Sequence, residues 1–398
     1  MPAYRRVHLL GSSSRHPGKA CPGSRTGASR APRVGSGAVN ALVHDPVRAL
    51  RPRLQEVLDR FLADQRSILT GIHVELGVLV DVASDLLRGG KRLRPAFCYW
   101  GWRGAGRPDD DAVMAAGAAL ELFQAAALVH DDLIDGSDTR RGMPSVHRRF
   151  AAQHADECWA GDPERYGAAA AVLLGDLLFG WSDELFNGSG FDEAALRRSR
   201  PVFDQMRAQV GAGQYLDVMA QVTGAGRPDR LAELARTVVS YKAARYSVER
   251  PLVLGGSAAA AGPELLAAYS RYGLALGEAF QLRDDVLGVF GDPASTGKPA
   301  GDDLREGKRT LLIAYTLERA DPAAADTVNR LLGDRTLDAT DVGTLRQIIV
   351  GTGALQAVEA QVAGLVEQSR QALVEAELTP EARTALDALV TAATSRIS

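Results

Sequence analysis

The sequence contains few cysteines and no long apolar run. Its 398 residues include three cysteines, Cys21, Cys98 and Cys158, and no two of them have C-x-x-C spacing. Three such thiols cannot build a disulfide framework, so they argue against a structural zinc site and favour a reducing compartment. No stretch approaches the roughly 18 uninterrupted apolar residues that mark a membrane-spanning helix. We therefore expect a soluble, cytoplasmic protein with no transmembrane segment.

Acidic residues are absent from the first forty positions. Residues 1–40 carry seven Lys and Arg residues and no Asp or Glu, with Gly, Ser and Pro between them. This composition predicts a disordered basic tail, either inert or a transit segment, since it lacks the apolar core of a secretory signal. The whole chain has a net charge of -3, so removing this +7 leaves -10 for residues 41–398. The acidic remainder predicts no nucleic-acid partner.

Lysine is also scarce. Only five of the 46 basic residues are lysine, and the other 41 are arginine. Because a compact ammonium and a planar guanidinium are not interchangeable, a retained lysine can mark a site that needs the ammonium, although chance retention is the alternative. Four lysines lie outside the tail, at Lys91, Lys242, Lys298 and Lys308.

The rest of the chain has a helical pattern. From residue 41 onward, apolar residues recur at spacings of three and four, and residues 74–82 are the main exception. Gly- and Pro-rich breakers separate long segments rich in Ala and Leu. The pattern predicts one all-α domain over residues 41–398, with roughly ten or more helices.

One predicted helix, from about residue 112, ends in two aspartates on the same face. Asp131 and Asp135 are four residues apart, which places their Cβ atoms about 5–6 Å apart. The face runs back through Ala127 and then Gln124 or Phe123, so it is largely apolar before it becomes anionic. Carboxylates that extend a buried stripe are costly unless a cation neutralises them.

A second predicted helix makes the same transition. The segment from Gly273 to Gln281 leads into Asp284 and Asp285. Three more aspartates follow, at Asp292, Asp302 and Asp303. Two such helices facing each other would form an acidic mouth above an apolar shaft. A site with only oxygen ligands suits Mg²⁺, which substrate phosphates usually complete. Solvated helix caps are the alternative for either acidic cluster alone.

Basic residues accompany both acidic clusters. Residues 89–95, Gly-Gly-Lys-Arg-Leu-Arg-Pro, place Lys91, Arg92 and Arg94 beside a Gly pair, and Arg140 and Arg141 follow the first acidic cluster. These groups predict a polyanion held through a divalent metal and bound by Lys and Arg. The sequence contains no nucleotide-binding P-loop of the form G-x-x-x-x-G-K-[ST].

In order along the chain, these motifs resemble those of the trans-isoprenyl diphosphate synthases, the all-α polyprenyl synthetases. Residues 89–95 are similar to the homoallylic-substrate motif of that family. Residues 130–142 are similar to its first Asp-rich motif, D-D-x-x-D with the Arg pair, and residues 280–291 to the second. The resemblance extends from about residue 45 to the C-terminus. It implies a single large helical bundle around a central apolar cavity, the isoprenoid synthase fold.

The resemblance implies a homodimeric prenyltransferase, similar to geranylgeranyl diphosphate synthases, that condenses isopentenyl diphosphate with an allylic diphosphate. The family's cofactor is a cluster of magnesium ions bridged by the allylic diphosphate. The implied residues for isopentenyl diphosphate are Gly90, Lys91, Arg94, Gln124 and Arg141. Those for the allylic diphosphate are Arg140, Lys242, Lys298 and Lys308. The implied metal ligands are Asp131, Asp135 and Asp284, with Asp285 and Asp302 acting through bound water.

The resemblance also implies a mechanism. The departing diphosphate is neutralised by the metal and Lys242, so the allylic C–O bond ionises to a cation in an apolar cavity that excludes water. The side-chain oxygen of Gln281 and the backbone carbonyl of Lys242 stabilise the cation. The double bond of isopentenyl diphosphate attacks it, and the released diphosphate removes a proton.

The chain departs from the family pattern at three positions. The fifth position of the second motif is Gly288 instead of Asp, which we expect to weaken metal binding without abolishing it. Ala243 stands where many members have Thr, so one hydroxyl near the cation is missing. Gln124 stands where some relatives have His, and either side chain can donate a hydrogen bond to a diphosphate.

Product length depends on the residues below the first motif. Ala126 and Ala127 replace the aromatic side chains that close the shaft in short-product members. Phe123, about one 5.4 Å helical turn deeper, is the candidate floor. We predict a C20 product, with C25 or longer as the next possibility.

Two other functions share some of these motifs. A class I terpene cyclase also uses D-D-x-x-D and magnesium, but it pairs them with an N-D-x-x-S-x-x-x-E element that this sequence lacks. A non-catalytic subunit of a heteromeric synthase usually lacks one acidic motif, whereas this chain has both.

Overall fold

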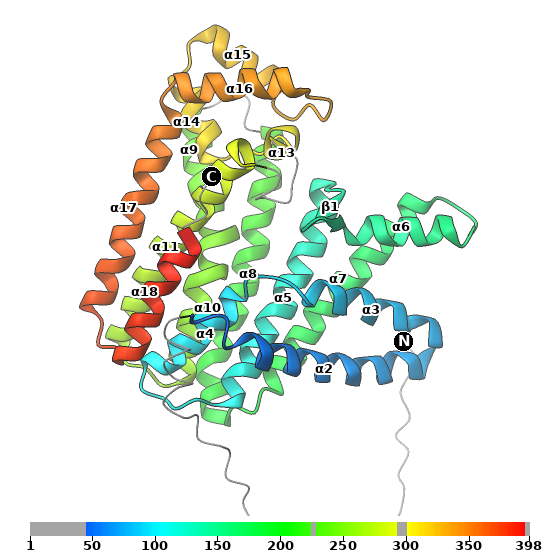
Figure 1. The fold of residues 1–398 in the computed structure, drawn as a ribbon, viewed down its shortest axis with the longest axis vertical. Helices are drawn as coiled ribbons and strands as arrows, with labels where there is room; N and C mark the ends of the chain where they lie inside the picture. Colours follow the sequence, from blue (N-terminus) through cyan, green and yellow to red (C-terminus); the bar gives the residue numbers. More distant parts are fainter. Residues whose placement is uncertain (1–44, 224–227, 293–300, 395–398) are drawn as a thin grey trace, which may run out of the picture.

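The computed structural model describes residues 45–223, 228–292 and 301–394, and these ranges are almost entirely helical (Figure 1). The predicted tail, residues 1–40, and Lys298 lie outside them. The first helices are α2 (Arg51–Ile72), the 3-10 helix η1 (Val74–Leu76), α3 (Gly77–Leu87), α4 (Leu93–Gly104), α5 (Asp111–Asp135), α6 (Val146–Asp156), α7 (Pro163–Asn187) and α8 (Glu193–Thr223). Those that follow are α9 (Pro228–Val238), the π-helix η3 (Val239–Glu249), α10 (Arg250–Ala258), α11 (Pro263–Phe290), α13 (Asp302–Arg305), α14 (Leu311–Arg319), α15 (Pro322–Leu331), α16 (Ala339–Gly351), α17 (Ala354–Glu375) and α18 (Pro380–Thr394). The predicted all-α class is confirmed.

Long helices form the centre of the bundle. Helix α5 packs along α7, η3 lies against both α8 and α11, and α17 covers another side of α11 (Figure 1). After α5, a short antiparallel ladder of β1 (Thr139–Arg140) and β2 (Met143–Pro144) reverses the chain. Arg140, the last residue of β1, lies at the end of α5, where its guanidinium donates to Asp132 at 2.8 Å.

Residues 74–82, which we set apart as non-helical in pattern, form η1 and the start of α3. The buried residues Val80, Ala83 and Leu87 follow one another at spacings of three and four. Packing of this face against α2 and α5 therefore outweighs the weak helix preference of the β-branched residues.

The apolar interior is divided into two clusters. One joins α2 to α8, α10, α18 and the N-terminal half of α11, and it includes Phe123 and Tyr272. The other joins α9, α14 to α17 and the C-terminal half of α11, and it includes Leu282 and Leu312. Helix α11 is thus part of both clusters.

Helix α5 is long and apolar enough to cross a membrane by length and composition, although the sequence has no uninterrupted apolar run of that length. However, 78% of its most apolar 18-residue window is buried inside the protein. A helix that is buried by its own protein belongs to the core.

Candidate active site

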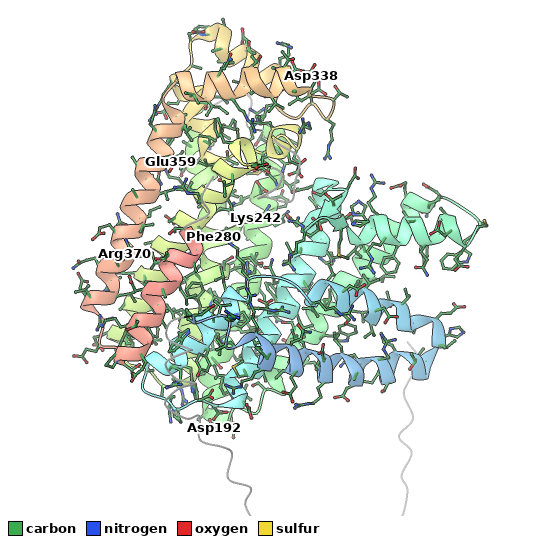
Figure 2. The ribbon with its side chains drawn as sticks, in the orientation of Figure 1. Asp192, Lys242, Phe280, Asp338, Glu359 and Arg370 are labelled. Atoms are coloured by element: carbon green, nitrogen blue, oxygen red, sulfur yellow. The ribbon has the colours of Figure 1, made fainter. Side chains whose placement is uncertain are left out.

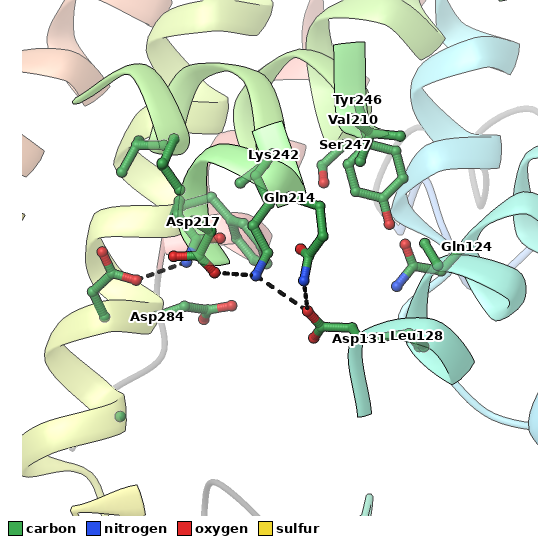
Figure 3. Close-up of a pocket in the computed structure, with 18 of the residues that line it drawn as sticks. Gln124, Leu128, Asp131, Val210, Gln214, Asp217, Lys242, Tyr246, Ser247 and Asp284 are labelled. Carbon is green, nitrogen blue, oxygen red and sulfur yellow. Dashed lines mark hydrogen bonds and ion pairs between the residues drawn. The ribbon is translucent and has the colours of Figure 1, made fainter. Parts of the chain in front are cut away.

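A cavity of about 490 Å³ lies between α5, α8, η3, α11 and the segment around α13 (Figure 3). It contains most of the predicted site residues. Those that line it are Gly90, Lys91, Arg94, Gln124, Ala127, Asp131, Arg140, Arg141, Lys242, Gln281, Asp284, Asp285, Asp302 and Lys308. Asp135, Phe123 and Ala126 are buried next to this lining but are not part of it. The two acidic helix ends therefore meet at one cavity, as predicted.

Asp131 is held by groups from three other segments. Its Oδ1 accepts a hydrogen bond from Gln214 Nε2 at 3.0 Å and lies 3.1 Å from Lys242 Nζ (Figure 3). Arg140 lies 3.6 Å from its other oxygen. Burial raises the pKa of Asp131, but the charges of Lys242, Lys308 and Arg140 outweigh burial and bring it to about 2. The carboxylate is therefore ionised near neutral pH.

Lys242 bridges α5 and α8. Besides Asp131, its ammonium pairs with Asp217 Oδ2 at 2.6 Å. Burial lowers the pKa of Lys242, but Asp131 and Asp217 more than offset this and raise it above its usual value. We did not predict Asp217. Its only signal was its position three residues after Gln214, which puts both side chains on one face of α8.

A π-helix positions Lys242. The backbone of η3 packs directly against glycines of the neighbouring helices. A Cβ on Gly213 of α8 would lie only 2.4 Å from the Lys242 backbone nitrogen. A Cβ on Gly277 of α11 would likewise lie 2.6 Å from the Ala244 Cα. π-Helical turns are rare and occur frequently at functional sites. Figure 2 labels Lys242 together with Phe280 of α11 near the middle of the bundle.

The second acidic cluster lies on α11. Asp284 lines the cavity, and the buried Asp285 accepts a hydrogen bond from Gln281 Nε2 at 2.7 Å. Burial raises the pKa of Asp285 to about 8, with the charges of Asp303 and Asp284 adding to this and the Gln281 bond opposing it. Since its nitrogen is directed to Asp285, the Gln281 side-chain oxygen is turned the other way.

Asp135 is paired with Lys308. Its Oδ2 lies 3.3 Å from Lys308 Nζ, while its buried Oδ1 has no hydrogen-bond partner in the described part of the chain. Burial raises the pKa of Asp135, and the charge of Lys308 opposes this shift. Lys308 also lies 3.5 Å from Asp303 and 2.5 Å from Glu306, so one ammonium serves three carboxylates.

Gly288 makes room for another carboxylate. A Cβ on Gly288 would lie 1.8 Å from Asp303 Oδ2 and 2.4 Å from Asp303 Cγ. Asp303 therefore occupies the space that a side chain at the fifth position of the second motif would take. We named Asp303 among the aspartates that follow the second predicted helix but gave a metal-binding role only to Asp302, and both line the cavity. The carboxylate that the motif lacks is thus present from a different segment.

Two arginines of the basic segment 89–95 have different partners. Arg94 donates to Ser247 Oγ at 2.6 Å and lies over the Tyr246 ring at 4.2 Å. Arg92, which we had grouped with Lys91 and Arg94 as an anion donor, is instead 5% exposed and paired with Glu121 at 2.5 Å. Its charge is therefore neutralised within the protein.

Arg141 lies over the Gly pair. A Cβ on Gly90 would be 3.1 Å from Arg141 Nη2, and Gly90 has a φ of +101°, a conformation that other residues rarely adopt. Gly90 thus brings the segment 89–95 and the Arg pair together. Of the lysines that the structure describes, Lys91, Lys242 and Lys308, all line the cavity.

The apolar wall below Asp131 is formed by Ala127 and Leu128. Phe123, our candidate floor, is 2% exposed and packs against Phe179 and Tyr246, with ring centroids 5.2 and 5.9 Å away. Tyr246 lines the cavity, so Phe123 lies behind it.

Comparison with known proteins decides the family. The family model described as Polyprenyl synthetase matches residues 77–349. The chain belongs to the polyprenyl synthetase family. A geranylgeranyl pyrophosphate synthase structure from Corynebacterium glutamicum, complexed with isoprenyl diphosphate and magnesium, superposes with a TM-score of 0.84. It is 38% identical and covers 88% of this chain and 99% of its own.

Two relatives are named for products of different chain length. The geranylfarnesyl diphosphate synthase of Aeropyrum pernix is 30% identical over 80% of this chain and 92% of its own. The geranylgeranyl diphosphate synthase of Saccharolobus solfataricus is 30% identical over 66% of this chain and 73% of its own. This polyprenyl synthetase is therefore a trans-prenyltransferase of isoprenoid biosynthesis that joins isopentenyl diphosphate to an allylic diphosphate. The matches do not favour a cyclase or a non-catalytic subunit.

The donor set of this polyprenyl synthetase fits magnesium. Among the described residues, no three Asp, Glu, His or Cys side chains lie close enough to hold a metal by themselves. The cavity instead offers separate carboxylates paired with lysines, and Asp135 keeps one buried oxygen unpaired. Such a set suits Mg²⁺, which keeps several waters and is completed by substrate phosphates.

Proposed function

We propose that this prenyltransferase makes the C20 product, geranylgeranyl diphosphate, with Mg²⁺ as its cofactor. The observation that carries the proposal is the cavity itself, where Asp131 and Asp284 stand at the mouth and Ala127 and Leu128 form the wall below. The small side chain of Ala127 at this depth leaves room for a chain longer than C15. The C25 product is the second candidate, supported by the likeness to the Aeropyrum pernix enzyme.

Two sets of basic residues would bind the two diphosphates. We assign isopentenyl diphosphate to Lys91, Arg94, Arg141 and Gln124. Arg94 Nε is a buried donor with no hydrogen-bond partner in the described structure, as expected of a group that awaits an anion. We assign the allylic diphosphate to Arg140, Lys242 and Lys308, with Lys298 beyond the described residues.

Asp131, Asp135 and Asp284 would hold the magnesium ions, with Asp285, Asp302 and Asp303 around them. When bound, magnesium supplies positive charge that stabilises the leaving diphosphate. Lys242 and Lys308 would then exchange their carboxylate partners for diphosphate oxygens. In the structure itself, Lys242 and Lys308 are paired with the carboxylates of the cavity.

The other residues act on the cation and its surroundings. The Gln281 side-chain oxygen, turned away from Asp285, would stabilise the positive charge after the allylic C–O bond breaks. The apolar wall of Ala127 and Leu128 would exclude water, which would otherwise quench the cation. The released diphosphate, retained by Lys242, would accept the proton that isopentenyl diphosphate loses.

We further propose that the enzyme is a cytoplasmic homodimer. Helix α7 exposes Val172 and Leu173, which are 42% and 61% accessible, and a second copy of the chain would bury them. Size-exclusion chromatography with light scattering should give twice the chain mass of 42.3 kDa.

A product assay tests the proposal. Purified enzyme is incubated with labelled isopentenyl diphosphate, Mg²⁺ and each of the C5, C10 and C15 allylic diphosphates, and the products are separated by chain length. We expect C20 from every starter that is accepted. A C15 end product would contradict the open wall. Asp131→Ala should abolish turnover, and unchanged turnover would contradict the catalytic assignment.

The same assay tests the floor of the cavity. Phe123 packs behind Tyr246, which lines the cavity. Phe123→Ala should therefore let Tyr246 move outward, deepen the cavity and lengthen the products by one or more C5 units. An unchanged product distribution would exclude Phe123 as the floor.

A further inference from the structure

Arg335 joins two parts of the molecule that meet at the cavity. It lies in the loop of residues 333–337 between α15 and α16, the two helices at the top of Figure 1. Its guanidinium donates to the backbone carbonyls of Asp135 and Gly136, the latter at 3.2 Å. Asp135 is the proposed metal ligand in the last turn of α5, so Arg335 contacts the backbone of the residue that carries the carboxylate.

The end of α5 is built to receive this contact. A helix leaves its last four carbonyls without partners within the helix, and they carry partial negative charge. Gly136 ends α5 with a φ of +63°, and its N–H and that of Ser137 return to the Asp132 carbonyl. The next carbonyls, of Asp135 and Gly136, accept from Arg335 instead. A Cβ on Gly136 would lie 3.3 Å from Arg335 Nη2, so glycine also permits the close approach.

The loop itself is fixed to the segment that carries Lys308. Gly333 N–H donates to the Leu304 carbonyl at 2.9 Å, and Arg305 Nε donates to the Leu337 carbonyl at 3.1 Å. Leu337 is buried in the apolar cluster of α14 to α17. Arg335 is therefore anchored on one side of the cavity and bonded to the other.

Two further contacts between these two sides use side chains at the end of α5 and just after it. Lys308 pairs with the Asp135 carboxylate, and Ser137 Oγ donates to Glu306 at 3.0 Å. Lys308 is expected to leave Asp135 when diphosphate and metal bind, which removes one of these links. The bond from Arg335 involves only the α5 backbone, so it can persist while the Asp135 carboxylate changes partner.

We propose that Arg335 is a positioning residue that holds the last turn of α5, and with it the Asp135 carboxylate, at the metal site. It acts through the backbone of α5 and touches neither substrate nor metal. The inference rests on the proposed role of Asp135 as a metal ligand. It predicts that Arg335 affects metal use more than overall stability.

The test compares Arg335→Ala and Arg335→Lys with Arg319→Ala. Arg319 is a matched control, because it is also exposed and donates to a backbone carbonyl, that of Gly353 at 2.9 Å, away from the cavity. Each full-length variant is assayed for the half-saturating Mg²⁺ concentration, kcat and KM. Its melting temperature is measured with and without Mg²⁺ plus inorganic pyrophosphate, which needs no turnover.

Arg335→Ala should raise the half-saturating Mg²⁺ concentration by about tenfold, in the range found when residues that orient metal ligands are removed. The stabilisation by Mg²⁺ and pyrophosphate should shrink, while the melting temperature of the free protein stays close to that of Arg319→Ala. Arg335→Lys should recover part of the loss, because an ammonium can still donate to a carbonyl.

Three outcomes would contradict the proposal. Arg335→Ala could match Arg319→Ala in Mg²⁺ dependence and in stabilisation by the ligands, which would refute positioning. Arg335→Ala could instead lower the melting temperature of the free protein by as much as it lowers the melting temperature with Mg²⁺ and pyrophosphate. That result would assign Arg335 a structural role only. If the wild-type protein did not respond to Mg²⁺ and pyrophosphate at all, the metal role of Asp135 would fail, and this outcome is distinguished by the wild-type measurement.

Discussion

Gly288 and Asp303 form a complementary pair, since the Asp303 carboxylate fills the space above the Gly288 Cα. A Cβ at 288 would displace that carboxylate, whose side chain is flexible enough to move without unfolding the helix. We predict that Gly288→Ala raises the Mg²⁺ requirement by up to about tenfold. Its melting temperature should not fall, because Ala favours a helix over Gly by about 1 kcal/mol. Mg²⁺ titration of activity and thermal denaturation measure the two effects.

Two further variants separate charge from space at this position. Gly364→Ala on α17 is the control, since a Cβ there meets nothing within 4 Å. The double variant Gly288→Asp with Asp303→Ala moves the carboxylate back to the motif position and should recover part of the Mg²⁺ affinity that Asp303→Ala loses. No recovery would show that the carboxylate is needed specifically on residue 303.

Individual site residues could be predicted where the chemistry repeats at a helical spacing. Asp131 and Asp135, four residues apart, are of this kind. Lys242 and Lys308 stood out instead because lysine is scarce in this sequence. Asp217 and Arg335 were missed because each is isolated in the sequence. They reach the site only because other segments pack against theirs, and a single sequence carries no signal of that packing.

At the scale of elements, the contact between α8 and η3 decides the position of Lys242. A Cβ on Gly213 would meet the Lys242 backbone at 2.4 Å, and backbone atoms cannot rotate away as a side-chain end can. Gly213→Ala should therefore shift η3, cost about 1–3 kcal/mol of stability as overpacking does, and lower kcat at least about tenfold.

Gly211 on the same helix provides the control for that change. A Cβ there meets nothing within 4 Å, so Gly211→Ala should keep kcat and gain helix stability. Steady-state kinetics and thermal denaturation of both variants give the comparison. Equal kcat in the two variants would contradict the importance of the close approach.

The long helices themselves could be predicted, because apolar residues recur at a helical period from α2 to α18. The π-helical form of η3 could not, since a π turn differs from an α turn by one residue and depends on glycines of α8 and α11. The prediction for residues 74–82 was wrong for a related reason, because the helical spacing of Val80, Ala83 and Leu87 outweighs the β-branched composition of the segment.

At the scale of the molecule, the cavity lies between two apolar clusters that α11 connects. A ligand that contacts both sides should stabilise the native state, because binding to the folded form alone shifts the unfolding equilibrium. We predict that Mg²⁺ with inorganic pyrophosphate raises the melting temperature by several degrees, equivalent to about 2–3 kcal/mol at a hundredfold excess over Kd.

Chelation of the metal is the control for this prediction. With EDTA present, pyrophosphate alone should give a smaller increase, because the aspartates then repel it. Hydrogen exchange should show the added protection in the last turn of α5, in η3 and around α13. Equal stabilisation with and without metal would indicate that the lysines and arginines bind pyrophosphate unaided.

The lysines at the cavity also determine how the protein can be labelled. Amine-reactive reagents attach most proteins at many incidental surface positions, but this chain has only five lysines, and Lys91, Lys242 and Lys308 lie at its catalytic mouth. Lys242 and Lys308 are ion-paired and mostly buried, so they should react slowly. Coupling through amines to a dye or a sensor surface would therefore attach the enzyme through the exposed Lys91 at the cavity or through amines outside the described residues. The exposed thiol of Cys158 offers a safer point of attachment, because the other described cysteine, Cys98, is buried.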